Sequence, residues 1–145
     1  MEHRVTAIAE APAEEVWRLF IDLERWPEMT RSMREVRRVD SGTLRVGSEA
    51  IVRQPRLPRT RWRVTELEPG HSFTWETTSP GVTTAGVHLV EADGQRAVIT
   101  LTLRQHGPLA RLTDAVTGRL AQTYLSMELE GFRLGAESAR DASGA

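Results

Sequence analysis

The sequence contains no cysteine and no lysine, and its 19 basic residues are all arginine. The absence of cysteine excludes disulfide bonds, thiolate metal sites and cysteine nucleophiles. The absence of lysine excludes Schiff-base chemistry and a lysine general base. The 4 histidines are scattered and show none of the spacings typical of metal ligands, so we expect no metal site. The chain also lacks the motifs of nucleophile-elbow hydrolases, P-loop enzymes and dinucleotide-binding enzymes.

Long apolar runs are absent too. None approaches the ~18 residues of a membrane-spanning helix, so we expect no membrane insertion. The first residues, MEHRVTAIAEAPAEE, are too acidic and too polar for a signal peptide, which favours a cytoplasmic protein. The net charge is only -1, so we expect no binding to nucleic acid. Residues 25–63 hold 11 arginines against 4 acidic residues, and a solvated strand face accounts for this excess better than an anion-binding surface.

The hydrophobic pattern indicates a strand first and helices next. The chain has 145 residues, of which 39% are hydrophobic and 27% charged, which suits one domain with its own core. The spacing predicts a strand over residues 3–10 and a helix that begins near Pro12 and ends before Pro27. A second short helix is expected over residues 27–33.

The rest of the chain changes period. From residue 34 to residue 105 apolar and polar residues alternate, which predicts about six antiparallel strands. A helix of roughly 25 residues follows Pro108, and its spacing predicts one apolar stripe that faces inward, at Leu109, Leu112, Val116, Leu120, Thr123, Met127, Gly131 and Leu134. Residues 136–145 are expected to be a flexible tail after a single domain over residues 1–135. One long helix packs best across the concave face of a curved sheet, which leaves room for a cavity. The predicted fold class is therefore α+β.

Several segments together resemble a known family. A D-x-x-x-W-P turn occurs at Asp22–Pro27, and the segments Trp62–Gly70 and Phe73–Glu76 and the Gly107-Pro108-Leu109 helix start lie further along. These segments resemble the START-like, Bet v 1-like superfamily (SRPBCC), and within it the bacterial polyketide cyclase/dehydrase branch. The resemblance implies a helix-grip fold, in which a curved sheet of about seven antiparallel strands wraps around the C-terminal helix, with two short helices after the first strand. It also implies an elongated cavity for hydrophobic, often aromatic or polycyclic, small molecules, and no metal or organic cofactor.

The alternation of the strands indicates which side chains face the predicted cavity. Trp62 and Trp75 lie on neighbouring strands and are expected to form a flat wall, although plain core packing explains them equally well. For residues 82–90 the resemblance places Thr84 and His88 inward, whereas the sequence alone leaves the set with Val87 open as the inward face. The expected ligand contacts are Trp62, Val64, Phe73, Trp75, Thr77, Thr84, Leu101, Leu120, Tyr124 and Met127.

Three side chains are candidates for chemistry. His88 is the first, because an imidazole in an apolar cavity could act as an acid or base near neutral pH. A histidine that is hydrogen-bonded to a neighbouring strand or exposed is the alternative interpretation. Arg53 is a weaker candidate, which an exposed position would exclude. Tyr124 is another weak candidate, while Glu128 is expected on the solvated side of the long helix.

Two functions remain open at this point. One is a carrier or sensor-like module that binds a small hydrophobic or aromatic ligand. The other is a cofactor-independent polyketide cyclase, aromatase or dehydratase that uses His88 as its acid-base group. Related aromatase/cyclases commonly carry an arginine after the aromatic pair, but residues 75–79 read Trp-Glu-Thr-Thr-Ser, which favours binding alone. The oligomeric state is expected to be a monomer or a homodimer.

Overall fold

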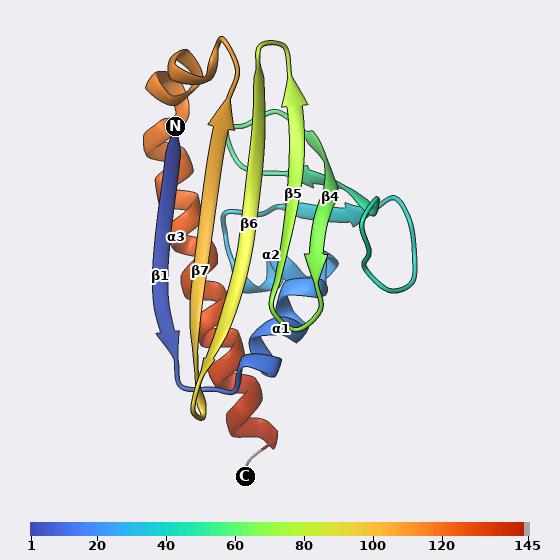
Figure 1. Cartoon of the computed structure of the whole chain (residues 1–145), viewed down its shortest axis with the longest axis vertical. Coiled ribbons are helices and arrows are strands. Elements are labelled where there is room, and N and C mark those ends of the chain that lie inside the picture. Colours follow the sequence, from blue (N-terminus) through green and yellow to red (C-terminus); the bar gives the residue numbers. More distant parts are fainter. Residues whose placement is uncertain (144–145) are drawn as a thin grey trace.

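A computed structural model describes residues 1–143, and seven strands form a single antiparallel sheet in the order β1-β7-β6-β5-β4-β3-β2 (Figure 1). Consecutive strands from β2 to β7 are neighbours, as short turns dictate, whereas β1 and β2 lie at opposite edges of the sheet because the chain crosses over between them. The strands are β1 (Glu2–Ala9), β2 (Glu35–Arg38), β3 (Glu49–Arg53), β4 (Thr60–Glu68), β5 (Ser72–Ser79), β6 (Val82–Asp93) and β7 (Arg96–His106).

Short helices follow β1, as expected. They are α1 (Ala13–Ile21), the 3₁₀ turn η1 (Leu23–Arg25) and α2 (Trp26–Met29). Pro12 precedes α1 in an extended conformation, and two glutamates in its first turn favour the positive end of the helix dipole. The second helix ends earlier than residue 33, because Thr30 is extended and its hydroxyl group hydrogen-bonds the Ser32 side chain at 2.7 Å.

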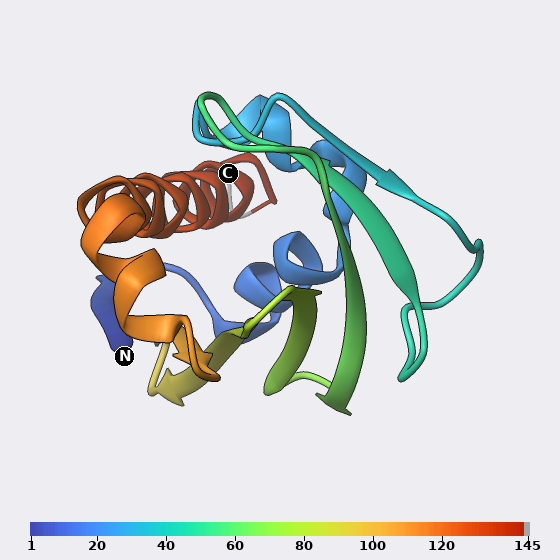
Figure 2. The ribbon, with the colours of Figure 1, turned by 90° about the horizontal axis from the view of Figure 1, so that it is seen from above.

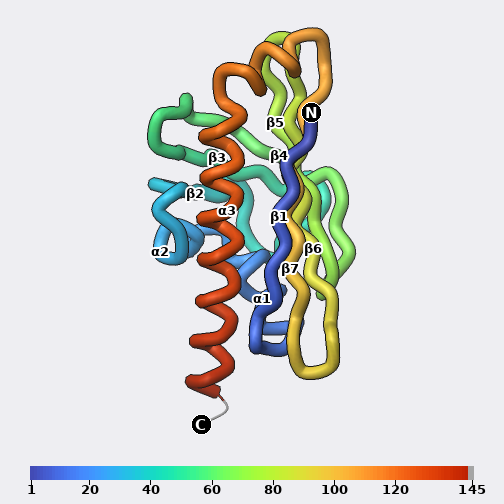
Figure 3. The backbone as a smooth tube through the Cα atoms, turned by 90° about the vertical axis from the view of Figure 1, so that its left-hand side faces the viewer, coloured from blue at the N-terminus to red at the C-terminus, as the bar shows by residue number. Residues whose placement is uncertain are grey.

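The sheet is strongly curved around the long helix α3 (Ala110–Ser143). Seen end-on, the strands form an arc with α3 and α1 inside it (Figure 2), and α3 runs along β1 and β7 for most of their length (Figure 3). A register shift between Val64 and Glu66 interrupts the β4–β5 pairing, and such bulges increase the local twist. The predicted helix-grip architecture is confirmed.

An aromatic cluster fills the space between the sheet and the C-terminal half of α3. Phe20, Trp26, Phe73, His88 and Phe132 are all at most 5% exposed. Their rings meet edge-on or stacked, with centroids 4.9 Å apart for Phe20 and Phe132 and 4.3 Å apart for Phe73 and His88. We call these five residues the aromatic plug. It fixes α1, α2, the sheet and α3 to one another at this end of the molecule.

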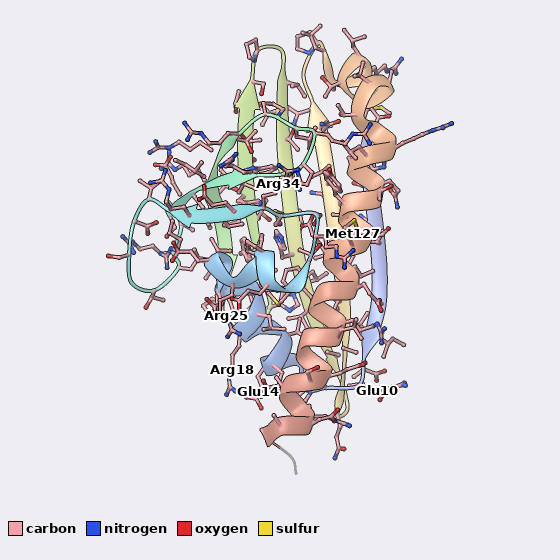
Figure 4. All side chains as sticks on the ribbon, turned by 180° about the vertical axis from the view of Figure 1, so that it is seen from behind. Glu10, Glu14, Arg18, Arg25, Arg34 and Met127 are labelled. Atoms are coloured by element: carbon pink, nitrogen blue, oxygen red, sulfur yellow. The ribbon has the colours of Figure 1, made fainter. Side chains whose placement is uncertain are left out.

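The C-terminal helix is longer than predicted. It continues through Ser143, so residues 136–143 are helical where a flexible tail was expected, and residues 144–145 lie outside the described residues. Ala136 is fully buried, and the Glu137 carboxylate accepts a hydrogen bond from the Glu10 backbone N–H at 2.8 Å, beside the lower end of α3 (Figure 4). These contacts extend the helix beyond the point at which its apolar stripe ends. No helix within residues 1–143 combines the length and apolar character that a membrane span requires.

Candidate functional site

A cavity of about 260 Å³ lies between the curved sheet and the N-terminal half of α3. Strands β3 to β7 form one wall, the helix forms the other, and the β3–β4 loop (residues 54–59) lies across one side. The lining residues include Leu57, Pro58, Trp62, Trp75, Thr77, Ser79, Val82, Thr84, Gly86, His88, Leu101, Thr113, Thr117, Ala121, Tyr124 and Glu128.

The cavity is elongated along α3. On the helix its lining extends from Thr113 to Glu128, which at 1.5 Å per residue corresponds to about 22 Å. On β6 it extends from Val82 to His88, which at 3.3 Å per residue corresponds to about 20 Å. His88 belongs to the aromatic plug, so the plug closes this inner end. The other end of the lining, at Ser79 and Val82, lies at the β5–β6 hairpin, where Ser79 is exposed.

Two indoles form one wall of the cavity. The rings of Trp62 and Trp75 stack with their centroids 5.2 Å apart and an angle of 30° between the planes. Gly86 lies opposite Trp75 on β6, and a Cβ atom there would come within 3.0 Å of the indole Nε1. Any larger residue at position 86 would therefore crowd the Trp75 indole. The Trp62 Nε1–H donates to Thr60 Oγ1 at 2.9 Å, which fixes the outer ring.

Glu128 faces the cavity, and its expected place on the solvated side of the helix was wrong. The side chain is buried, and no hydrogen bond or ion pair joins it to another residue in the described part of the chain. Burial penalises the charged carboxylate and raises the pKa of Glu128 from 4.5 to about 8. The residue lies one helical turn from Tyr124 and one from Phe132, on a single face of α3.

His88 lies at the inner end of the cavity and is buried. Its ring stacks on Phe73 across the β5–β6 pair, and its Nδ1 atom has no hydrogen-bond partner within residues 1–143. Burial lowers the pKa of His88 from 6.5 to about 3, against a smaller opposing effect of the Phe73 backbone. The imidazole is therefore neutral at physiological pH. Between residues 1 and 143, no three His, Asp or Glu side chains converge on a point where a metal ion could bind.

Tyr124 and Arg53 have different surroundings. Tyr124 lines the cavity, and its hydroxyl group donates to the backbone carbonyl of Pro55 in the β3–β4 loop. This bond ties the loop to the middle of α3, while Leu57 and Pro58 from the same loop cover the outer part of the cavity. Arg53 is exposed at the end of β3 and does not line the cavity. This is the exposed position that excludes Arg53 as a candidate for chemistry.

The other expected contacts divide into three groups. Those that line the cavity with the two tryptophans are Thr77, Thr84 and Leu101. Val64 and Phe73 are buried in the core and do not line it. Leu120 and Met127 are only half-buried on α3 and lie outside the lining.

The predicted apolar stripe of α3 was out of phase with the observed inner face. At the N-terminal end of the helix, Leu112 is 61% and Val116 77% exposed. Thr117 and Ala121 face the cavity in their place. Glu128 lies four residues after Tyr124, which was expected in the cavity, and this spacing was the sequence pattern that could have placed the Glu128 carboxyl group there as well.

Comparison with protein families identifies the group to which this architecture belongs. The model of the family described as polyketide cyclase / dehydrase and lipid transport matches residues 2–137. The chain belongs to this family. The resemblance drawn from the sequence motifs is thereby confirmed. Among curated proteins, no sequence matches the chain.

Solved structures share the fold of this family member at low sequence identity. The di-domain ARO/CYC StfQ of the steffimycin biosynthetic pathway has a TM-score of 0.76 and 12% identity, over 99% of this chain and 52% of that one. The di-domain ARO/CYC BexL of the BE-7585A pathway has a TM-score of 0.70 and 19% identity, over 94% and 46%. The chain thus spans about half of each di-domain protein. Norcoclaurine synthase from Thalictrum flavum, solved with dopamine and hydroxybenzaldehyde, has a TM-score of 0.65 and 13% identity, over 88% and 84%.

Proposed function

We propose that the protein binds a hydrophobic, aromatic or polycyclic small molecule in the cavity beside α3 and acts as a carrier or sensor-like module. The stacked pair of Trp62 and Trp75 along an elongated cavity carries this proposal. A planar ligand that stacks on such a wall gains about 0.5–1.5 kcal/mol per ring beyond the burial of its surface. The family description, which joins cyclases and dehydrases with lipid transport, agrees with a small apolar ligand.

The first test is to identify what the purified protein holds and to measure its binding. Native mass spectrometry of the freshly purified protein should reveal a co-purifying apolar molecule, whose affinity tryptophan fluorescence then measures. Trp62→Leu should weaken that affinity up to about tenfold, because the ligand loses one stacking ring. Trp62 suits the test, because it stacks on Trp75 and lies outside the aromatic plug.

The matched control is Trp17→Leu. Trp17 is half-buried on α1 and does not line the cavity, so this substitution should leave the affinity unchanged. Equal affinities of the Trp62→Leu variant and the unsubstituted protein would contradict binding against the indole wall.

A second candidate function is a cofactor-independent cyclase, aromatase or dehydratase. Glu128 favours it, because a carboxyl with a pKa of about 8 can exchange a proton near neutral pH. His88 was the expected acid-base group, but with a pKa of about 3 it suits a neutral hydrogen-bonding role better. If the co-purified molecule is turned over, Glu128→Gln should abolish turnover. The cytoplasmic location and the monomeric or homodimeric state stay predictions.

A further inference from the structure

The cavity contains no positively charged side chain. None of the 19 arginines lines it, and the chain has no lysine. Its titratable lining residues are His88 on β6 and Tyr124 and Glu128 on α3. The imidazole is neutral, so the only charge that this lining can develop near neutral pH is the negative charge of one carboxylate. A ligand with a carboxylate or phosphate group would find no cation there.

Two polar groups at the inner end lack partners. Glu128 is 9% exposed and makes no hydrogen bond or ion pair with any residue from 1 to 143. His88 is 5% exposed, and its Nδ1 atom is also without a partner there. The His88 Nδ1 atom has no accessible surface, so a ligand cannot reach it. Glu128 lines the cavity, and buried polar groups in native proteins are almost always hydrogen-bonded, which indicates that a ligand supplies the partner that its carboxyl group lacks.

We propose that the ligand carries a basic nitrogen beside its aromatic body and that this nitrogen binds Glu128 at the inner end of the cavity. The inference rests on the proposed function, because it specifies the ligand of the same cavity. A protonated amine satisfies the carboxylate with a charge-assisted hydrogen bond. The indoles of Trp62 and Trp75 line the same cavity, and the face of an aromatic ring attracts a cation and not an anion.

Binding of an amine should change the number of protons that the protein and the ligand hold. Near pH 7 the free amine is protonated, and burial keeps the Glu128 carboxyl largely protonated as well, because its pKa is raised to about 8. In the complex the nitrogen and the carboxylate share one proton, so the other is released to the buffer. Binding of an amine should therefore release about one proton, and binding of a neutral analogue none.

The experiment compares three ligands that share one aromatic body: naphthylmethylamine, naphthylmethanol and naphthoate. Isothermal titration calorimetry near pH 7, in buffers with different heats of ionisation, gives the affinity and the number of protons released. We expect the amine to bind at least about tenfold more tightly than the alcohol, with naphthoate weakest. Glu128→Gln should reduce the affinity for the amine to that for the alcohol. Glu130→Gln, on the exposed side of the same helix, is the matched control and should retain the preference.

Each result decides the question. A tenfold preference for the amine with proton release, lost in Glu128→Gln and kept in Glu130→Gln, supports the inference. Equal binding of amine and alcohol, tighter binding of naphthoate, or a preference that survives Glu128→Gln overturns it. If the alcohol binds without any preference for the amine, the cavity is still a binding site and only the inference about the nitrogen fails. If none of the three ligands binds, the proposed function fails with it.

Discussion

Glu128 and His88 are two titratable side chains in the cavity lining whose pKa values are shifted by burial, and burial keeps both uncharged. The same loss of solvation acts in opposite directions on an acid and a base: it raises the pKa of Glu128 to about 8 and lowers the pKa of His88 to about 3. Both groups are therefore neutral over the pH range between these values. Each stabilises the fold only in its neutral form, so each makes stability depend on pH.

Glu128→Gln should remove a loss of stability at alkaline pH. The unfolded chain gives up this proton near pH 4.5, whereas the folded protein keeps it up to about pH 8. Stability therefore falls as the pH rises between these values, by as much as about 1.4 kcal/mol per unit. Urea unfolding at several pH values should show the variant to be a few kcal/mol more stable than the unsubstituted protein near pH 8 and similar to it near pH 5.

The acid side of the profile provides an internal control. His88 stabilises the fold above its unfolded pKa of 6.5, and this contribution is lost as the pH falls towards about 3. Glu128→Gln should leave that decline in place, and Glu130→Gln, which removes only an exposed ion pair with Arg133, should show no gain in stability near pH 8. Parallel stability profiles for Glu128→Gln and the unsubstituted protein would show that the carboxyl is not buried.

Glu128 was expected in solvent for a physical reason. Charged residues are rarely buried without a partner, so the default expectation places a helical glutamate in solvent. The indole wall could be predicted, because alternation along β4 and β5 places Trp62 and Trp75 on one face whatever fills the space beside them.

Among the elements, the β3–β4 loop and α3 depend on each other. The loop lies across one side of the cavity, and the Tyr124 hydroxyl group on the helix donates a hydrogen bond to the Pro55 carbonyl in the loop. Arg56 in the same loop has a positive φ of 69°, a conformation that costs a residue with a side chain some strain. The contact with Tyr124 therefore holds in place a segment with little regular structure of its own.

Tyr124→Phe should loosen the β3–β4 loop. The substitution removes the hydroxyl group that donates to Pro55 and should cost about 1 kcal/mol of stability. Hydrogen exchange measured by mass spectrometry should accelerate in residues 54–59 and stay unchanged in residues 40–48, a loop that α3 does not hold. Unchanged exchange in residues 54–59 would show that other contacts hold the loop.

The two faces of α3 explain why its inner side was mispredicted. A packed helix turns its most apolar face inward, and the positions of Leu112 and Val116 follow that expectation in the sequence. The N-terminal half of α3 faces a cavity instead of a packed core, so Thr117 and Ala121 can lie inside and the two apolar residues outside. Where a helix faces a cavity, the spacing of its apolar residues alone does not determine which face points inward.

Across the whole molecule, the element order and the fold followed from the sequence, whereas the division between packed and hollow regions did not. Alternation and turn residues determine seven strands and one long helix. The extent of the aromatic plug depends on how rings from α1, α2, β5, β6 and α3 meet. Residues distant in the sequence, such as Phe20 and Phe132, create these contacts, and local patterns do not encode them.

Truncation should show that the end of α3 is part of the folded body. A chain that ends at Leu134 loses the buried Ala136 and the Glu137 carboxylate that binds the Glu10 N–H. We expect a loss of about 2 kcal/mol, or roughly 5 °C in melting temperature by calorimetry. A chain that ends at Arg140 keeps both contacts and should melt like the full chain. Equal melting temperatures of both truncated chains would mean that the last turns contribute nothing.

The aromatic plug also limits the length of the cavity, because it closes the inner end. Each of its rings touches several others, so shortening one would leave the neighbouring rings to settle inward and would not lengthen the hollow cleanly. The cavity is therefore easier to lengthen by substitutions away from the plug, at Pro58 and Ser79, which line the cavity and are exposed. The packing of the core therefore sets the length of the cavity, and the residues at the hairpin end are the ones that can be changed without disturbing that packing.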